Sequence, residues 1–235
     1  MTARSLAKHK AQRSRPLISV LMPVHNAAET LEDVLDDLRA QDLEDHEVLV
    51  VLNGITDASA EIAEEAAKRD PRLTLIDRPV AGIVEALNHG LRVARSDLVA
   101  RMDADDRMAP DRLRRQRDAL LTNPDYALVT CQVRCEMLGG GPAGDDMQRL
   151  VKRLNRLDTP DRIASSRYID FPVIHPAVAY RREAVRAVGG YRMGAFGEDH
   201  DLWLRMLRAG QRFAMVPRPL VTWRDHPGRM TRNDP

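Results

Sequence analysis

Cysteine is almost absent from this 235-residue sequence, which contains only Cys131 and Cys135. Both lie in residues 127–137, where apolar residues alternate with mostly polar ones, a pattern typical of a strand. Four residues along a strand would separate the two sulfurs by about 13 Å, which is beyond the reach of a disulfide. Two cysteines without other ligands nearby also make a poor zinc site. We therefore expect both to be small core residues without a redox or metal role.

Aromatic residues make up only 4% of the chain, and its formal net charge is +1. A nucleic-acid-binding surface would need clustered basic residues and exposed aromatic side chains, so no nucleic-acid partner is expected. No apolar run approaches the roughly 18 residues that cross a membrane. We expect a soluble, cytoplasmic protein with at most a peripheral association with the inner face of the cell membrane. Residues 1–16 are basic and poor in apolar side chains, which predicts a disordered tail.

The sequence does contain a regular alternation of apolar runs and helical patterns, with 43% hydrophobic residues to form a core. Short apolar runs predict buried strands, and the segments between them repeat apolar residues at helical spacing. This alternation predicts parallel strands joined by right-handed crossovers, with helices on both faces of the sheet. The expected strands are residues 17–22, 47–52, 73–76 and 98–102, and the expected helices are residues 31–38, 57–67 and 82–94.

The second half of the chain lacks this alternation. It contains the cysteine-bearing strand, a polar helical segment, a proline-containing stretch and two further helices, at residues 147–155, 171–180, 182–188 and 202–210. No segment is long enough to act as a linker between domains. The sequence therefore predicts one α/β domain over residues 17–235. A Rossmann-like, mostly parallel sheet would occupy residues 17–106, and an α+β extension would occupy residues 107–235.

Three aspartates, Asp103, Asp105 and Asp106, directly follow the fourth predicted strand. Carboxylate oxygens are the ligands that Mg²⁺ and Mn²⁺ prefer, although a solvated acidic turn is the alternative. Side chains two apart in a strand lie roughly 7 Å from each other, so two of these acids could share one cation only across a turn. Ligands bind beyond the carboxyl ends of parallel strands. The loops at residues 23–26, 53–57 and 103–106 should therefore form one crevice.

A second acidic group, Glu198, Asp199 and Asp201, lies at the start of a predicted helix. Helix capping explains part of it, because the helix dipole favours negative charge in the first turn. The same dipole would keep the Asp199 carboxylate ionised and ready to accept a proton. Capping and general-base catalysis are therefore compatible at Asp199.

Three glycines, Gly139, Gly141 and Gly144, have the G-x-G-x-x-G spacing of dinucleotide-binding loops. Pro142 would remove a backbone donor from such a loop, and Asp145 would place negative charge where pyrophosphate should bind. We therefore expect a flexible loop here and no dinucleotide site.

Five segments, in this order and spacing, resemble the motif series of the inverting family-two glycosyltransferases with the GT-A fold. The similarity runs from about Leu17 to His226. It implies a nucleoside-diphosphate sugar donor, a Mn²⁺ or Mg²⁺ ion, and inverting transfer of the sugar to a hydroxyl of a glycan or lipid-linked glycan. Residues 17–106 would bind the donor, and residues 107–235 would shape the acceptor side. The segments are SVLMPVHNAAETL, EVLVVLNGITDAS, GIVEALNHGLRVARSDLVARMDADD, HPAVAYRREAVRAVGGY and EDHDLWLRM.

The resemblance assigns roles to both acidic groups. Asp103 and Asp105 match the pair that binds the ribose of the donor and, through the metal, its diphosphate, and Asp106 would assist. Asp199 matches the general base of these enzymes, with Glu198 beside it. The resemblance thus implies metal chemistry at one acidic group and proton chemistry at the other.

Further positions match parts of these enzymes that contact the donor or the metal. His226 resembles a C-terminal histidine that completes the metal shell, although an exposed loop histidine is the alternative. Where the family has two acids before a glycine, this chain has Leu52 and Asn53, so an amide would replace the carboxylate that contacts the base. The identity of the base therefore stays open. The other donor-side matches are Pro23, His25, Asn26, Asp57, Gly82, Asn88 and Gly90, of which the last four also have purely structural explanations.

Two other functional classes remain open. A nucleotidyltransferase of related fold also uses a metal and acids, but it would show a glycine-rich, basic loop after the first strand, where this chain has PVHNAAET. A non-catalytic sugar-nucleotide or glycan-binding module would lack the base, whereas Asp199 is present. Trp203 follows the second acidic group at helical spacing, and we expect it in the core and not as a platform for a sugar.

Overall fold

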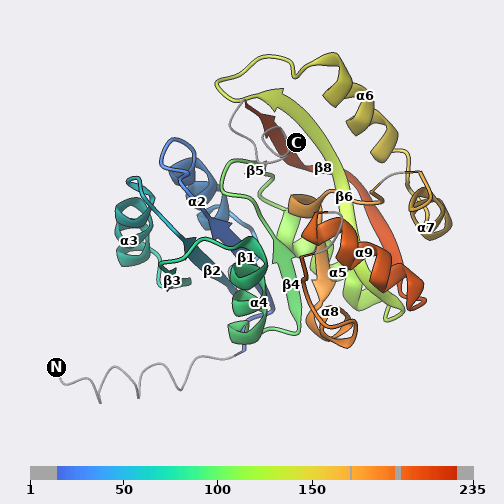
Figure 1. Ribbon diagram of the computed structural model, residues 1–235, viewed down its shortest axis with the longest axis horizontal. Coiled ribbons are helices and arrows are strands. Elements are labelled where there is room, and N and C mark those ends of the chain that lie inside the picture. The colour runs from blue at the N-terminus through green and yellow to red at the C-terminus, as the bar shows by residue number, and fades with distance from the viewer. Residues whose placement is uncertain (1–14, 170, 194–196, 227–235) are drawn as a thin grey trace.

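Eight strands form one sheet in the computed structural model, which describes residues 15–169, 171–193 and 197–226. The four strands of the first half are parallel and lie in the order β3-β2-β1-β4 (Figure 1). The predicted helices connect them, so the α/β prediction is confirmed. The strands are β1 (Ile18–Val24), β2 (His46–Asn53), β3 (Leu73–Arg78) and β4 (Leu98–Arg101), and the helices are α2 (Leu31–Arg39), α3 (Ser59–Arg69) and α4 (Ile83–Val93).

Strand β1 continues through Pro23 to Val24, although the sequence predicted that this proline would end it. Proline has no N–H to donate to a neighbouring strand. The carbonyl of Leu21 accepts from the N–H of Met102, on the side of β4, and residues two apart in a strand direct their backbone groups the same way. The nitrogen of Pro23 therefore points to the side of β4, but at a position beyond Arg101, the last residue of β4 that pairs with β1. Among the described residues, no strand lies there to accept a hydrogen bond, so the proline costs none.

The second half of the chain extends the sheet with strands of both directions. β7 lies antiparallel to β4, β6 antiparallel to β7, β8 parallel to β6, and β5 antiparallel to β8. The predicted α+β character of this half is confirmed. Its elements are β5 (Arg107–Met108), α5 (Arg112–Thr122), β6 (Tyr126–Met137), α6 (Asp145–Leu154), α7 (Pro160–Ser166), a 3₁₀ turn (His175–Ala177), β7 (Ala179–Arg181), α8 (Arg182–Ala187), α9 (Glu198–Arg208) and β8 (Arg212–Asp225).

The sequence did not predict α5, α7 and β8, nor the short elements β5, β7 and the 3₁₀ turn. In α5, the polar residues Arg112 and Gln116 occupy buried positions, which conceals the apolar face that identifies a helix. In β8, Pro217 and Pro219 interrupt the strand pattern. Prolines are tolerated at a sheet edge, and β5 covers only two residues of the outer side of β8. Both patterns could be interpreted only once the neighbouring elements were placed.

Helices cover both faces of the sheet (Figure 1). α2, α3 and α5 pack on one face, α4, α8 and α9 pack on the other, and α6 packs with β6 and β8 in a third apolar cluster. α4 lies very close to β1, because a Cβ atom at Gly90 would lie 2.0 Å from Cδ1 of Leu21. Gly90 therefore brings this helix nearer to the sheet than any larger residue would allow.

A disordered tail was predicted for residues 1–16, and residues 1–14 of it lie outside the described residues. Residues 15 and 16 are described and contact the rest of the protein. Arg15 forms an ion pair with Asp97, and its Nε donates to the carbonyl of Arg95 at 2.8 Å. Pro16 is buried. These contacts make residues 15 and 16 part of the domain.

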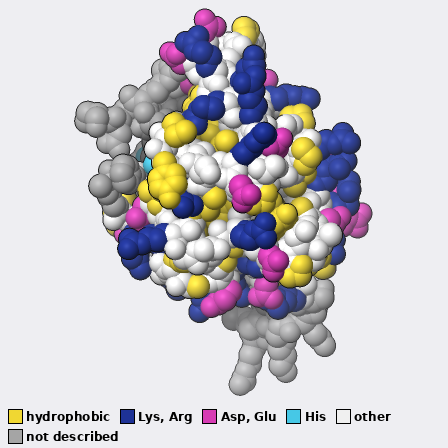
Figure 2. Space-filling model, turned by 90° about the vertical axis from the view of Figure 1, so that its right-hand side faces the viewer, with side chains coloured by type: hydrophobic (Ala, Val, Ile, Leu, Met, Phe, Trp, Pro, Cys, Tyr) yellow, Lys and Arg dark blue, Asp and Glu magenta, His cyan; other side chains and the backbone are white. Residues whose placement is uncertain are grey.

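The surface of the described residues carries basic and acidic side chains interspersed with apolar ones, as Figure 2 shows for one face. Within the ranges that the structure describes, no helix combines the length and the apolar character needed to span a bilayer. The two cysteines are free thiols: Cys131 is buried and Cys135 is half-buried, which agrees with a packing role.

Trp203 is fully buried, as predicted, and its ring packs edge-on against Phe213 at a centroid distance of 6.1 Å. Replacing Trp203 with alanine is expected to lower the free energy of unfolding by about 3–5 kcal/mol, because the substitution leaves a cavity. Denaturant unfolding measures the loss. Leu121→Ala is the control, since Leu121 is 52% exposed, and should change this free energy by less than about 0.5 kcal/mol. Equal losses in the two variants would contradict the buried position of Trp203.

Candidate active site

The loops after β1 and β2 are cross-linked at the carboxyl edge of the sheet. Nδ1 of His25 lies 2.7 Å from the carbonyl oxygen of Asn53. The amide of Asn26 donates to the Thr56 hydroxyl and accepts from the Thr56 N–H, both at 2.8 Å. Asn26 adopts a positive φ of 47°, which asparagine tolerates better than most residues. The structure thus places His25, Asn26 and Asn53 together on the side where a donor nucleotide was predicted.

Asp57 builds this loop pair with its side chain. One carboxylate oxygen accepts from the Ala28 N–H at 2.9 Å, and the other accepts from the Ser59 N–H at 3.0 Å. Desolvation alone would raise the pKa of Asp57, but the hydrogen bonds from Ser59 and Ala28 hold it below its ordinary value. Asp57 is therefore ionised and uses both oxygens within the protein, which is the structural explanation that the sequence allowed.

Asn53, the residue that replaces the family's acid, is buried at the end of β2. Its Oδ1 accepts from the N–H of Gly82 at 2.9 Å, which ties β2 to the start of α4. The Nδ2 amide remains as the group of this side chain that is able to donate to a ligand. Pro23, in contrast, is buried within β1, which leaves little of its side chain for a ligand to contact.

The aspartates after β4 lie on a turn at residues 104–105, because the strand ends at Arg101. Asp103, Asp105 and Asp106 each offer a carboxylate oxygen, and these three oxygens lie within 4.8 Å of one another. The turn therefore removes the 7 Å separation that an extended strand would have imposed. His226 lies against the same group, with its Nε2 2.9 Å from Oδ2 of Asp105. Residues 121 positions apart in sequence thus meet as predicted.

The turn is held from two other elements. The hydroxyl of Thr30, before α2, donates to the carbonyl of Ala104 at 2.8 Å. Arg224, near the end of β8, donates from Nε to the carbonyl of Asp105 and pairs with Asp33 of α2 at 2.9 Å. This bracing fixes the backbone of the turn while the side chains of Asp103 and Asp105 stay half-buried.

Asp106 has a structural position that the sequence did not reveal. It is fully buried, and its Oδ1 accepts from the backbone N–H of Arg224 at 2.9 Å. This bond joins the aspartate turn to the end of β8, directly before His226. Asp106 therefore places the histidine next to Asp105. Because the Asp106 side chain is fully buried, it is less accessible to a ligand than the side chains of Asp103 and Asp105.

The cluster has the chemistry that a Mg²⁺ or Mn²⁺ site requires. Three carboxylates supply hard oxygen ligands from one short turn, and the imidazole of His226 supplies a nitrogen that Mn²⁺ also accepts. Excess negative charge in one place favours a bound cation. Asp103, Asp105 and His226 are therefore able to hold a divalent metal ion, with Asp106 as the buried support.

Glu198 and Asp199 form the second acidic group, in the first turn of α9. Burial raises the pKa of Asp199, and burial together with the neighbouring Asp199 charge raises the pKa of Glu198. The sequence predicted that the helix dipole would keep Asp199 ionised, so the direction of this shift is a correction. Desolvation outweighs the dipole here, since the charged form loses its hydration. Asp201, in the same turn, forms an ion pair with Arg205 at 2.6 Å, in agreement with its predicted structural role.

Arg101, which the sequence did not single out, connects the two acidic groups. It is the last residue of β4, is only 4% exposed, and forms an ion pair with Asp103. Burial alone would lower the pKa of Arg101, but the Asp103 carboxylate raises it above its ordinary value. The positive charge of Arg101 also opposes, without cancelling, the rise that burial causes in the pKa values of Glu198 and Asp199. The only sequence signal was an arginine at the end of an otherwise apolar strand.

His175 is the second residue that the sequence did not single out. Its Nδ1 lies 3.7 Å from Oε1 of Glu198 and 4.0 Å from Oδ2 of Asp199. The 3₁₀ turn that carries it directly precedes β7, which pairs with β4 and so brings this segment beside Arg101. HPAVAY was part of a recognised motif, but nothing in it separated a ligand-facing histidine from a core residue.

Asn88 contacts the backbone of Tyr191, whose hydroxyl lies 3.0 Å from Nε2 of His175. Its amide donates to the carbonyl of Tyr191 at 2.9 Å and accepts from the Tyr191 N–H at 3.0 Å. The backbone at Gly190 has a φ of 71°, and a Cβ atom there would lie 2.7 Å from Oδ1 of Asn88. Both polar atoms of Asn88 thus clamp the segment before α9, and donor binding by this residue remains a prediction.

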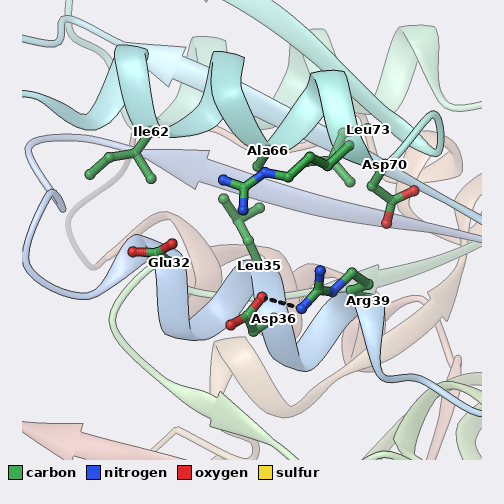
Figure 3. A pocket seen from close by; sticks show the side chains of 9 residues that line it. Glu32, Leu35, Asp36, Arg39, Ile62, Ala66, Asp70 and Leu73 are labelled. Carbon is green, nitrogen blue, oxygen red and sulfur yellow. Dashed lines mark ion pairs between the residues drawn. The ribbon is translucent and has the colours of Figure 1, made fainter.

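Two surface grooves lie apart from these acids. The first lies between α2 and α3 and holds about 30 Å³, too little for a sugar nucleotide (Figure 3). Charged side chains line it, including Asp36 and Arg39, which pair at 3.0 Å. The second holds about 360 Å³ between α5, α7 and β8. Its arginines Arg114 and Arg115 are paired with Asp42 and Asp111, and, among the described residues, neither groove is lined by the aspartates after β4 or by the acids of α9.

Comparison with known proteins gives consistent matches over most of the chain. Residues 19–189 match the family described as Glycosyl transferase family 2. The amylovoran biosynthesis glycosyltransferase AmsE of Erwinia amylovora is 28% identical over 209 residues, which are 87% of this chain and 75% of AmsE. The O-antigen biosynthesis protein RfbC of Myxococcus xanthus is 32% identical over 90% of this chain, but these residues are only 16% of RfbC.

A solved structure has the same fold. The mannosyltransferase PcManGT from Pyrobaculum calidifontis, in complex with GDP-Man and Mn²⁺, superposes with a TM-score of 0.70 and 24% sequence identity. The matched region covers 93% of this chain and 62% of PcManGT. The predicted single-domain architecture with a mostly parallel sheet and a mixed second half is therefore that of solved glycosyltransferases.

Proposed function

We propose a reaction for this chain, which belongs to glycosyl transferase family 2 and is a glycosyltransferase. In this reaction it transfers a sugar from a nucleoside-diphosphate sugar to a hydroxyl of a glycan or lipid-linked glycan, with inversion of the anomeric configuration. One observation carries the proposal. The buried Arg101 forms an ion pair with Asp103, beside Asp105 and His226, and its charge also acts on the acid pair of Glu198 and Asp199. Such an arrangement would supply a leaving-group site and a base site close to each other.

The relatives support a role in polysaccharide synthesis. AmsE and RfbC are named as proteins of amylovoran and O-antigen biosynthesis, and the structure of PcManGT is a complex with GDP-Man and Mn²⁺. Each of these statements concerns the relative. For this chain we propose the shared chemistry, which is a sugar-nucleotide donor, a divalent cation and a growing glycan as acceptor.

The donor diphosphate would bind beside the aspartate turn. When bound there, a divalent cation stabilises the negative charge that grows on the diphosphate as the glycosidic bond breaks. Asp105, Asp103 and His226 would hold this ion, and the braced backbone of the turn would fix their positions. Because the diphosphate gains negative charge as the bond breaks, this placement would stabilise the transition state more than the bound donor.

The acceptor proton would go to Asp199. Inversion by direct displacement requires the acceptor hydroxyl to attack from the face opposite the diphosphate, so the base must stand apart from the metal group. Asp199 meets this condition because it belongs to a different element, α9. Its raised pKa makes it a stronger base than an ordinary aspartate once it is ionised. The carboxylate of Asp199 accepts the hydroxyl proton while the hydroxyl oxygen bonds to the anomeric carbon.

The base of the donor would be read by an amide. Asn53 stands where the family has a carboxylate, and its free Nδ2 is a donor, whereas a carboxylate only accepts. A base that presents an acceptor at this point, such as a carbonyl oxygen, would therefore fit better than one that presents an N–H group. A panel of sugar nucleotides with different bases tests this preference directly.

Turnover tests the proposed function. The protein is incubated with Mn²⁺ and a panel of UDP-, GDP-, CDP- and dTDP-sugars, and the release of free nucleoside diphosphate is measured. We expect release from at least one donor, and none without a divalent cation. Pyrophosphate release from a nucleoside triphosphate and a sugar phosphate would instead indicate a nucleotidyltransferase. Donor binding with neither product would indicate a binding module, and either result would contradict glycosyl transfer.

A further inference from the structure

A chain of buried polar side chains runs from β7 to the acid pair of α9. The hydroxyl of Tyr180 lies 3.3 Å from the hydroxyl of Tyr191, which in turn lies 3.0 Å from Nε2 of His175. At its other nitrogen, Nδ1, His175 faces Glu198 at 3.7 Å and Asp199 at 4.0 Å. The two tyrosines are fully or almost fully buried. The imidazole is therefore the last member of the chain, and its Nδ1 lies within 4.0 Å of both acids.

Each member of the chain is electrically neutral. Burial raises the pKa of Tyr191 well above its ordinary value and that of Tyr180 to about 12, so both phenols keep their protons. Burial, together with the nearby charge of Arg101, lowers the pKa of His175 well below its ordinary value. A neutral imidazole carries one N–H and one acceptor nitrogen, so only one ring nitrogen donates at a time.

The acids determine which nitrogen of His175 carries the proton. If Nε2 carried it, the lone pair of Nδ1 would face two carboxylates, which is a repulsive contact. If Nδ1 carries it, Nε2 accepts from the hydroxyl of Tyr191, and Tyr180 donates to Tyr191. The second arrangement points every proton of the chain towards Glu198 and Asp199. A histidine ring that is oriented by a partner on its far nitrogen is a common way to fix a tautomer.

The ring is also fixed mechanically. It packs edge-on against Trp203 at a centroid distance of 5.7 Å and lies tilted against Tyr191 at 5.5 Å. The backbone of its turn is held by Arg112, whose Nη2 donates to the carbonyls of Pro176 and Arg101, both at 2.7 Å. The N–H group therefore keeps its place when the acid side chains move.

We propose that His175 is a positioning residue of the reaction, which presents its Nδ1–H to the Glu198 and Asp199 carboxylates and holds the base in its reactive orientation and charge. This inference rests on the proposed function. The other groups that face the acids are Arg101 at the end of β4, Asp103 after it, Tyr191 before α9 and His200 within α9. Arg101 and His175 come from the protein interior, and the donor and acceptor would occupy the remaining side.

The tautomer is tested first, in the protein without substrate. In ¹⁵N-histidine-labelled protein, the ring nitrogen shifts should identify a neutral ring at pH 7 with the proton on Nδ1. The signal is assigned by its absence in the His175→Asn variant. A ring protonated on Nε2, or a charged ring, would overturn the proposal whatever the turnover, so this result is independent of the proposed function.

Two variants of similar volume then separate a positioning role from packing. In His175→Asn, the side-chain amide can place an N–H donor near the position of Nδ1, which faces the acids. In His175→Gln, the amide reaches the position of Nε2 instead, so no donor faces the acids. We expect His175→Gln to lower kcat by about 10- to 100-fold, the range for a lost hydrogen bond to a charged group, into which the 3.7 Å contact with Glu198 would tighten in the substrate complex. The KM for the donor should not change. His175→Asn should recover most of kcat.

The pH profile provides the readout that packing alone would not change. Loss of an N–H donor raises the pKa of the carboxylate that it faced, so the acidic limb of the kcat profile should move to higher pH in His175→Gln. Tyr180→Phe, which removes only the far end of the chain, should leave the limb in place. Equal losses of kcat in both His175 variants, with an unmoved limb, would show a structural role and overturn the proposal.

Discussion

Replacing Asp199 with asparagine is expected to lower kcat by about 10²- to 10⁴-fold, the usual contribution of a general base. Asparagine has the same shape, and its Oδ1 would still accept from the N–H of His200, a bond of 2.7 Å in this structure. The substitution therefore removes the proton acceptor and little else. Steady-state transfer kinetics measure the loss, while the affinity for the donor, measured by titration, should stay close to that of the wild type.

The pH dependence has a definite sign. Because burial raises the pKa of Asp199, activity should fall as the pH drops through this raised pKa, where the base becomes protonated. For stability, the folded protein binds the proton more tightly than the unfolded chain, so ionisation of Asp199 costs folding free energy above this pKa. Asp199→Asn removes that cost. The variant should be at least as stable as the wild type at pH 7, which excludes unfolding as the cause of lost activity.

Asp201→Asn is the matched control for Asp199→Asn. It neutralises an acid in the same helical turn, but Asp201 is engaged by Arg205 in an ion pair of 2.6 Å. Its kcat should remain near the wild-type value. If Asp199→Asn instead lost donor binding while keeping turnover at saturation, the roles of the two acidic groups would be reversed.

Replacing Asp105 with alanine is expected to abolish metal-dependent donor binding. Asp105 contributes one of the three clustered carboxylates and contacts His226, so its loss removes charge and a ligand together. A thermal-shift panel first identifies the donor, since a bound ligand raises the midpoint of unfolding. The wild type should show a larger shift with donor and Mn²⁺ than with donor alone. In Asp105→Ala, the addition of Mn²⁺ should make no difference.

The fold of Asp105→Ala should be intact, because Arg224 contacts the backbone carbonyl of Asp105 and not its side chain. Asp125→Ala is the control for the change in charge, since Asp125 precedes β6 at the opposite edge of the sheet. It should titrate with donor and Mn²⁺ as the wild type does. His226→Ala should weaken the effect of Mn²⁺ without removing it. A normal titration of Asp105→Ala would remove the metal assignment.

Much of the site was predictable because it lies at the ends of elements with strong local patterns. The apolar runs of β1, β2 and β4 specify buried parallel strands, and the carboxyl ends of such strands share one edge. The positions of His25, Asn53 and Asp105 at that edge follow from this rule. The acids of α9 were recognised from their motif, but their position opposite the aspartate turn required a tertiary contact between distant segments.

Several roles could not be predicted because they depend on contacts between residues far apart in the chain. His175 faces the acids only because β7 pairs antiparallel with β4. Asn88 was expected at the donor, yet both its polar atoms bind the backbone of Tyr191. The direction of the pKa shift at Asp199 also depends on burial, which no helix-dipole argument from sequence includes.

The sequence by itself therefore determined the elements of the first half, their order and the two acidic groups, since apolar periodicity and residue chemistry are local properties of the chain. The tertiary structure decided which polar residues face the crevice and which hold the fold together. Asp106 and Asp105 are adjacent and chemically identical, yet one is buried against Arg224 and the other meets His226. Their difference arises from the turn after β4 and from the end of β8, which comes within reach only when the whole sheet has formed.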